Sequence, residues 1–206
     1  MKIKSIAAAV LAAGFASGVM AAPSSAQTSA AAPAPIATGP AIPGICVLNN
    51  DYVLGGSAVG KFVINRLGQL KAQVDAELNG QGSSLQADAK ALETQRTTLS
   101  SDQYGQKVGA LQARDRDLQR LAQLRQRELQ ATQEKAFGVI GQQAEPIIRQ
   151  AVGEKSCSIL LNGAAVVVTN PGMDLSPLVV QRLDAKIQQF AFDREHLDTQ
   201  AAGAGQ

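Results

Sequence analysis

The sequence lacks tryptophan, contains one histidine, and draws only 3% of its 206 residues from the aromatic types. That share is low for a globular enzyme core and ordinary for a coiled-coil protein. The histidine, His196, lies at the edge of a polar tail, where we expect an exposed bystander. No nucleophile elbow, phosphate-binding glycine loop or metal-ligand cluster is recognisable. We therefore expect no enzyme, no cofactor and no bound metal.

An excess of charge is also missing. The net charge is +2, and loss of Lys2 and Lys4 with an N-terminal signal would leave 17 basic and 17 acidic residues. A near-neutral chain argues against nucleic acid as the main partner. The few aromatic residues also predict a small core, which oligomerisation would complete.

Long hydrophobic runs are absent except near the N-terminus. Lys2 and Lys4 precede an apolar run at residues 6–19, and small residues follow. This order is typical of a secretory signal peptide, which we place at residues 1–21, with cleavage near Ala21 or, alternatively, Ala26. The run is short and rich in Ala and Gly for a transmembrane helix, although an uncleaved anchor is the competing interpretation. The mature protein is expected in an exported, periplasmic location.

Two segments have the composition of disordered chain. Residues 22–43 are rich in Pro, Ala and Ser and carry no charge, so they cannot bury enough apolar surface to offset their ordering entropy. Residues 193–206 turn polar and small and end in AAGAGQ. We expect a linker in the first case and a disordered tail in the second.

Residues 57–156 predict one long helical hairpin, the arm. Apolar residues recur there at helical or heptad spacing, with polar residues between them. A turn at Tyr104-Gly105, near the midpoint, would give two antiparallel helices of roughly 45 residues, each on the order of 65 Å long. The narrow seam suits a two-helix contact that projects from a small body. Its residues are Leu67, Leu70, Val74, Leu78, Leu85, Leu92, Leu99, Val108, Leu111, Leu118, Leu121, Ala136, Ile140, Ala144, Ile147 and Ala151.

Proline and glycine interrupt this helical pattern. Pro146 removes a backbone hydrogen bond, so we expect either a kink, which we favour, or a helix break. Each interior glycine costs about 1 kcal/mol relative to alanine, which indicates either bending points or helix ends. These glycines are Gly80, Gly82, Gly105, Gly109, Gly138 and Gly141.

The body is expected from two pieces, residues 44–56 and 157–192. Residues 45–48 are β-prone, and residues 158–169 form two apolar runs around Asn162-Gly163, which predicts a β-hairpin. Ser176-Pro177 resembles an N-cap followed by proline at the first helical position, and a short amphipathic helix should follow.

Two further sets of residues are candidates for function. Arg116, Arg120 and Arg127 fall within about 40° on one helical face, a stripe suited to anionic lipid, lipopolysaccharide or acidic segments, or merely a solvated face. Cys46 and Cys157 each lie at a predicted body strand. In an exported protein they could form a disulfide within or between chains, or stay as buried free thiols. The absence of CxxC argues against redox catalysis.

The chain resembles the Skp/OmpH family of periplasmic outer-membrane-protein chaperones over residues 44–190. The resemblance rests on DLQR at 117–120, ELQ at 128–130, PII at 146–148 and the strand, loop and helix order of 158–183. It implies a mainly α fold with a small β body, in which helical hairpins project from a trimerisation domain around a cavity. The near-neutral mature charge departs from the basic members of that family. Trimer-forming residues would be Ile45, Val47, Ile159, Leu161, Val166 and Val168.

The resemblance implies a homotrimeric holdase that works without ATP and binds unfolded outer-membrane β-barrel proteins. Projecting, weakly packed arms suit the same role, because they can enclose a large client through many shallow contacts. The alternative is a structural coiled-coil spacer or adaptor of the cell envelope that docks one folded partner. Flexible arms favour the holdase, and rigid arms favour the spacer.

Overall fold

A computed structural model of the chain describes residues 38–197. The expected signal peptide, residues 22–37 of the linker, and residues 198–206 of the tail lie outside the described residues. The elements are β1 (Ile45–Leu48), α1 (Asn50–Gly56), α2 (Ala58–Thr94), α3 (Ser101–Glu154), β2 (Ile159–Asn162) and α4 (Ser176–Lys186), with 3-10 turns at Gly163–Ala165 and Pro171–Met173. The predicted fold class, long helices with a small β body, is confirmed.

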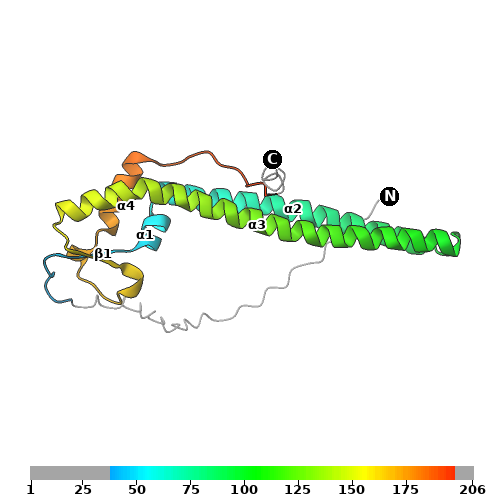
Figure 1. The fold of residues 1–206 in the computed structure, drawn as a ribbon, viewed down its shortest axis with the longest axis horizontal. Coiled ribbons are helices and arrows are strands. Elements are labelled where there is room, and N and C mark those ends of the chain that lie inside the picture. The colour runs from blue at the N-terminus through cyan, green and yellow to red at the C-terminus, as the bar shows by residue number, and fades with distance from the viewer. Residues whose placement is uncertain (1–37, 198–206) are drawn as a thin grey trace, which may run out of the picture. The chain divides into compact units, whose positions relative to one another are not determined.

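The arm is formed by α2 and α3, which lie side by side and extend beyond the body (Figure 1). The predicted seam is confirmed, because Leu70, Val74 and Leu92 of α2 are buried and Leu78 and Leu85 are half-buried. On α3 the buried stripe matches the prediction at five positions spaced by three or four residues. These are Ala136, Ile140, Ala144, Ile147 and Ala151.

The turn of the hairpin lies at residues 95–100, so the prediction of a turn at Tyr104-Gly105 was wrong. Ser100 forms a capping box with Gln103 and starts α3 four residues before Tyr104. The two helices are therefore unequal, with 37 residues in α2 and 54 in α3. Tyr104 lies in the first turns of α3, where its hydroxyl donates to Glu93 Oε2 at 2.9 Å and lowers the pKa of that carboxyl.

Replacing Ser100 tests what fixes this turn. The Ser100 hydroxyl accepts a hydrogen bond from Gln103 N at 3.3 Å, and the Gln103 side chain accepts one from Ser100 N. Ser100→Ala should lower the free energy of unfolding by about 1 kcal/mol and speed amide exchange in the first turn of α3. Ser101→Ala, one residue inside the helix, is the matched control. Equal effects of the two variants would show that the capping box does not hold the tip.

The proline and all six glycines lie inside continuous helices. α3 runs through Pro146, so a helix break at that position is excluded. Gly80 and Gly82 lie within α2, and the other four lie within α3, so none of them marks a helix end. Bending at these glycines stays a prediction, and uniformly slow hydrogen exchange through them would contradict it.

The body contains two parallel strands, and the predicted β-hairpin at Asn162-Gly163 was wrong. β1 pairs with β2 in the register Ile45 to Ile159 through Leu48 to Asn162. The Asn162 side chain accepts a hydrogen bond from Ala164 N at 3.0 Å, which starts a 3-10 turn where a hairpin return was expected. Val167 beyond it is 99% exposed.

α4 packs chiefly against α1 and α3 and starts one residue earlier than predicted. Ser176 is its first residue and not its N-cap, and Asp174 Oδ1 accepts from Ser176 N at 2.8 Å. The Ser176 hydroxyl donates to Asp174 Oδ1 at 2.6 Å and accepts from Asn49 N at 2.8 Å. This buried hydroxyl therefore joins the end of β1 to the start of α4.

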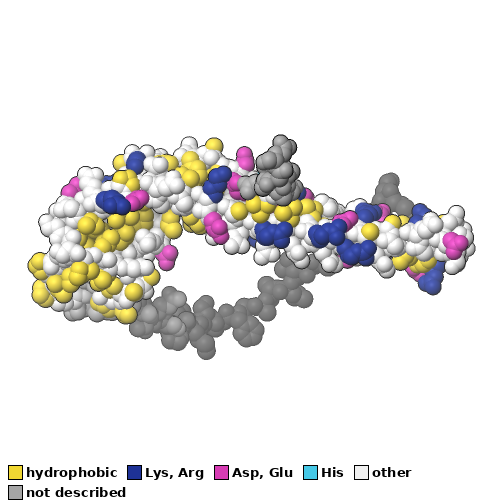
Figure 2. Space-filling view, in the orientation of Figure 1, with side chains coloured by type: hydrophobic (Ala, Val, Ile, Leu, Met, Phe, Trp, Pro, Cys, Tyr) yellow, Lys and Arg dark blue, Asp and Glu magenta, His cyan; other side chains and the backbone are white. Residues whose placement is uncertain are grey.

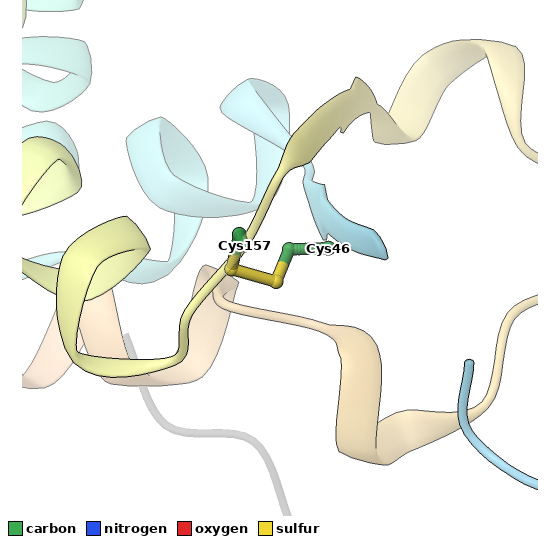
Figure 3. Close-up of a disulfide and its surroundings, with 2 residues drawn as sticks. All are labelled: Cys46 and Cys157. Atoms are coloured by element: carbon green, nitrogen blue, oxygen red, sulfur yellow. A yellow bond between two sulfur atoms is a disulfide. The ribbon is translucent and has the colours of Figure 1, made fainter. Parts of the chain in front are cut away.

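One hydrophobic core joins the body to the base of the arm. Val59 and Val63 from α2, Ile140 from α3, and Val179 and Leu183 from α4 are all 0 to 1% exposed. The core also includes one side of a disulfide. Cys46 and Cys157 are bonded, with Cα atoms 5.7 Å apart (Figure 3). The bond ties β1 to the segment that leaves α3.

Candidate functional site

The exposed apolar surface of the body centres on β2. Ile159, Leu160 and Leu161 are 52%, 39% and 40% exposed, and Val168 is 47% exposed. Within residues 38–197, β2 pairs with β1 alone, so its other edge keeps free backbone donors and acceptors. An apolar strand with an open edge is a template for pairing with another chain. Figure 2 shows hydrophobic side chains gathered over this end of the molecule.

The six residues predicted to form a trimer divide between the inside and the surface of the body. Val47 is buried, and Ile45 and Val166 are half-buried. β1 is flanked on both sides, by β2 and by Leu175, whose N donates to Val47 O at 2.9 Å. β1 therefore supports the sheet, while Ile159, Leu161 and Val168 remain accessible.

The distal arm has little interior of its own. Between residues 75 and 127, Leu92 alone is buried, and the other seam leucines are half-buried. Two shallow hollows of about 390 and 280 Å³ open between the helices there. The larger is lined by Gln81, Ser84, Leu85, Arg114, Asp117, Leu118 and Leu121. Apolar floors with charged rims suit weak contacts with many partners.

A third hollow lies where the arm meets the body. It has a volume of about 530 Å³ and a mostly apolar lining from α1 and α3. Its residues are Asn50, Val53, Leu54, Phe137, Ile140, Gly141, Ala144, Glu145, Ile148 and Arg149. The helix α1, which the sequence analysis did not predict, forms one wall and starts at the N-cap Asn49.

The predicted basic stripe lies on α3. Arg116, Arg120 and Arg127 are all exposed, and Arg120 pairs with Asp117 on the same helix. Basic side chains are visible along the arm in Figure 2. The neighbouring Arg114 instead bridges to Asp88 of α2 at 2.5 Å, so it ties the two helices together.

The prediction of a disordered tail was wrong for residues 193–197. Residues 187–197, here called the strap, leave α4 without regular secondary structure and run along the arm (Figure 1). Phe190 and Phe192 pack against the hydrophobic core. Asp193 pairs with Arg66 at 2.6 Å, and Glu195 pairs with Lys135 at 2.8 Å. The strap is thus held by apolar and ionic contacts.

A buried carboxylate anchors the strap. Glu128 on α3 is fully buried and pairs with Arg194 of the strap and with Arg125 at 3.0 Å. Leu197 N also donates to Glu128 Oε1 at 3.3 Å. Arg125 in turn donates to both oxygens of Glu77 on α2, which holds the pKa of that carboxyl below its ordinary value. One ionic cluster therefore joins both helices and the strap.

The burial of Glu128 was not predicted, yet the sequence carries a readable signal for it. Glu128 and Thr132 extend the buried stripe that begins at Ala136 backwards in steps of four. A carboxylate on a core-facing stripe requires a buried partner. One such partner, Arg194, lies 66 residues away in a segment whose composition resembled a tail.

Residues 38–197 contain no group of three or more His, Cys, Asp or Glu side chains placed to hold a metal ion. No helix in the same range is long and apolar enough to cross a membrane.

Comparison with known proteins places these features in context. A family model described as outer membrane protein (OmpH-like) matches residues 44–183. A crystal structure from Caulobacter crescentus CB15, named as a candidate outer membrane chaperone (OmpH-like), is 42% identical to this chain. The match covers 78% of this chain and 95% of that one, with a TM-score of 0.74. No curated protein matches this sequence significantly.

Proposed function

Because this chain belongs to the OmpH-like outer membrane protein family, we propose that it is a periplasmic holdase chaperone that works without ATP. Its clients are unfolded outer-membrane β-barrel proteins, which it keeps apart until they insert. Unfolded barrel strands have unpaired edges that associate with one another, so a protein that separates them prevents aggregation.

The thin packing of the distal arm is the observation that carries this proposal. Half-buried leucines and shallow hollows line the seam, and Leu92 alone is buried between residues 75 and 127. The arm therefore offers many weak apolar contacts and no single deep site. Such a surface can hold chains of varied sequence and release them without an energy source.

A homotrimer built through the body would complete the binding surface. The open apolar edge of β2, with Ile159, Leu161 and Val168 accessible, offers the contact between chains. Three arms that extend from one body would enclose a cavity for a single client. Ile45, Val47 and Val166 would support this contact from inside each chain.

The mature protein should behave as a trimer in multi-angle light scattering. It should also keep a urea-unfolded outer-membrane β-barrel protein soluble after dilution without nucleotide, at about one trimer per client. A trimer that gives no protection would favour an envelope spacer with one folded partner. If the protein is a monomer and still keeps the client soluble, the proposed trimer is wrong and the holdase function stands.

The basic stripe provides a separate test for contact with anionic lipid or lipopolysaccharide. Changing Arg116, Arg120 and Arg127 together to Gln should weaken association with vesicles that contain anionic lipid about a hundredfold at low salt, since each basic residue near such a surface contributes about 1 kcal/mol. Cosedimentation with vesicles measures this. The matched control changes Lys61, Lys90 and Lys107, three exposed lysines of the arm, and alters net charge equally. Equal losses of vesicle binding in both variants would mean that the stripe acts only through the net charge of the arm.

A further inference from the structure

We propose that the groove beneath the strap is a binding site for extended polypeptide segments with two aromatic residues spaced by one, and that the strap is its built-in competitor. The groove comprises Phe62 and Arg66 of α2 and Glu128, Thr132, Lys135, Ala136 and Val139 of α3. This inference rests on the proposed function, because it names the client feature that one part of the arm recognises.

Arm side chains hold the strap partly through its backbone. Arg66 Nε donates to Phe192 O at 3.4 Å, and Thr132 Oγ1 accepts from Glu195 N at 2.9 Å. Glu128 Oε1 accepts from Leu197 N at 3.3 Å. Every chain offers the same backbone groups, so these contacts are available to an extended segment of almost any sequence.

The selective part of the groove is an aromatic slot. Phe192 meets Phe62 edge to face with ring centroids 6.5 Å apart, and Phe190 lies 5.3 Å from Phe192. In an extended chain, residues two apart point to the same side. Transmembrane β-strands alternate in the same way and carry aromatic girdles at both membrane interfaces. A barrel strand can therefore present the pair of rings that the strap presents.

The slot also has room beyond what the strap fills. A hollow of about 230 Å³ remains between the strap and α3, lined by Thr132, Lys135, Ala136 and Val139 on the arm side. Tyrosine or tryptophan, both larger than phenylalanine, would occupy this space. Client strands therefore have contacts to gain that the strap does not make.

The strap competes as part of the same chain. If it occupies the groove nine-tenths of the time or more, the apparent affinity for any other segment falls about tenfold or more. Short or weakly matched segments are then excluded, while a long client that contacts several arms at once can displace the strap. Return of the strap would favour release.

Fluorescence anisotropy with labelled peptides tests the proposal. The probes are IQQFAFDREHL, which copies residues 187–197, a barrel-strand peptide with two aromatic residues spaced by one, and versions with serine at both aromatic positions. The mature protein lacking 188–206 should bind both aromatic probes about tenfold or more tighter than the protein lacking only 198–206, which keeps the strap. Serine probes should bind neither protein.

A full-length double variant guards against misfolding of the truncated chain. Phe190→Ser with Phe192→Ser empties the slot without shortening the protein and should also bind the aromatic probes more tightly than the natural chain. Equal affinity in strap-containing and strap-lacking proteins, or equal binding of serine and aromatic probes, would overturn the proposal. Protection of an unfolded barrel protein by the intact chain is measured separately. If the chain protects the client but shows no selective peptide binding, the groove proposal is wrong and the holdase proposal stands. If it binds the peptides but gives no protection, the holdase proposal is wrong and the groove proposal stands.

Discussion

Replacing both cysteines with alanine is expected to lower the free energy of unfolding by about 4 to 5 kcal/mol. The Cys46–Cys157 bond closes a loop that contains the whole arm, because the two residues are 111 positions apart. In the chain-entropy model a loop of about this length restricts the unfolded chain by that amount. Urea unfolding at one fixed protein concentration measures the change, since assembly would make stability depend on concentration.

Reduction provides the control for this variant. The natural protein in dithiothreitol should lose nearly the same stability, whereas Cys46→Ala with Cys157→Ala should not respond to the reductant. Cys46 is buried, so the alanine variant also loses a little packing that reduction leaves intact. Two titratable thiols in the unreduced, urea-unfolded protein would contradict the bond.

Local periodicity predicted the long helices well. The seam of α2 and the stripe of α3 follow from apolar spacing, because a two-helix contact needs few other determinants. The turn position was wrong because symmetry was given more weight than the capping signal at Ser100 and Gln103. The side chains of those two residues accept hydrogen bonds from the backbone N–H groups of Gln103 and Ser100, which have no partner within the helix.

The β body was harder to predict because its pairing is not local. Asn162-Gly163 has the composition of a hairpin turn, yet β2 pairs in parallel with β1, which precedes it by more than 100 residues. The disulfide and the hydrogen bond from Leu175 N to Val47 O favour this arrangement. Neither long-range contact can be read from residues 158–169 alone.

The strap shows a different limit of sequence analysis. Composition correctly describes residues 193–197 as polar, but their charges have fixed partners on the arm. A polar segment becomes ordered when one of its charged side chains pairs with a buried side chain of opposite charge. Glu128 requires Arg194 in this way, so the fate of the strap was determined by a residue 66 positions earlier.

Replacing Glu128 with alanine is expected to lower the free energy of unfolding by about 3 kcal/mol or more. The change leaves Arg194 and one side of Arg125 without their carboxylate, and removing one partner of a buried ion pair costs about 3 to 5 kcal/mol. Urea unfolding measures the loss. Glu145→Ala is the matched control, because it removes an exposed pair with Arg149 from the same helix and should change stability by about 0.5 kcal/mol or less.

A double-mutant cycle separates the strap from the rest of this cluster. Arg194→Ala alone leaves Glu128 paired with Arg125, which donates at 3.0 Å, so it should cost less than Glu128→Ala. If the pair between Glu128 and Arg194 holds the strap down, the two changes together should cost about 1 to 3 kcal/mol less than their sum. Strict additivity would mean that Glu128 stabilises the protein independently of Arg194, through Arg125 and Leu197 N. The strap would then dock through its phenylalanines and its other ion pairs, and its binding to the groove would not depend on the charge of Arg194.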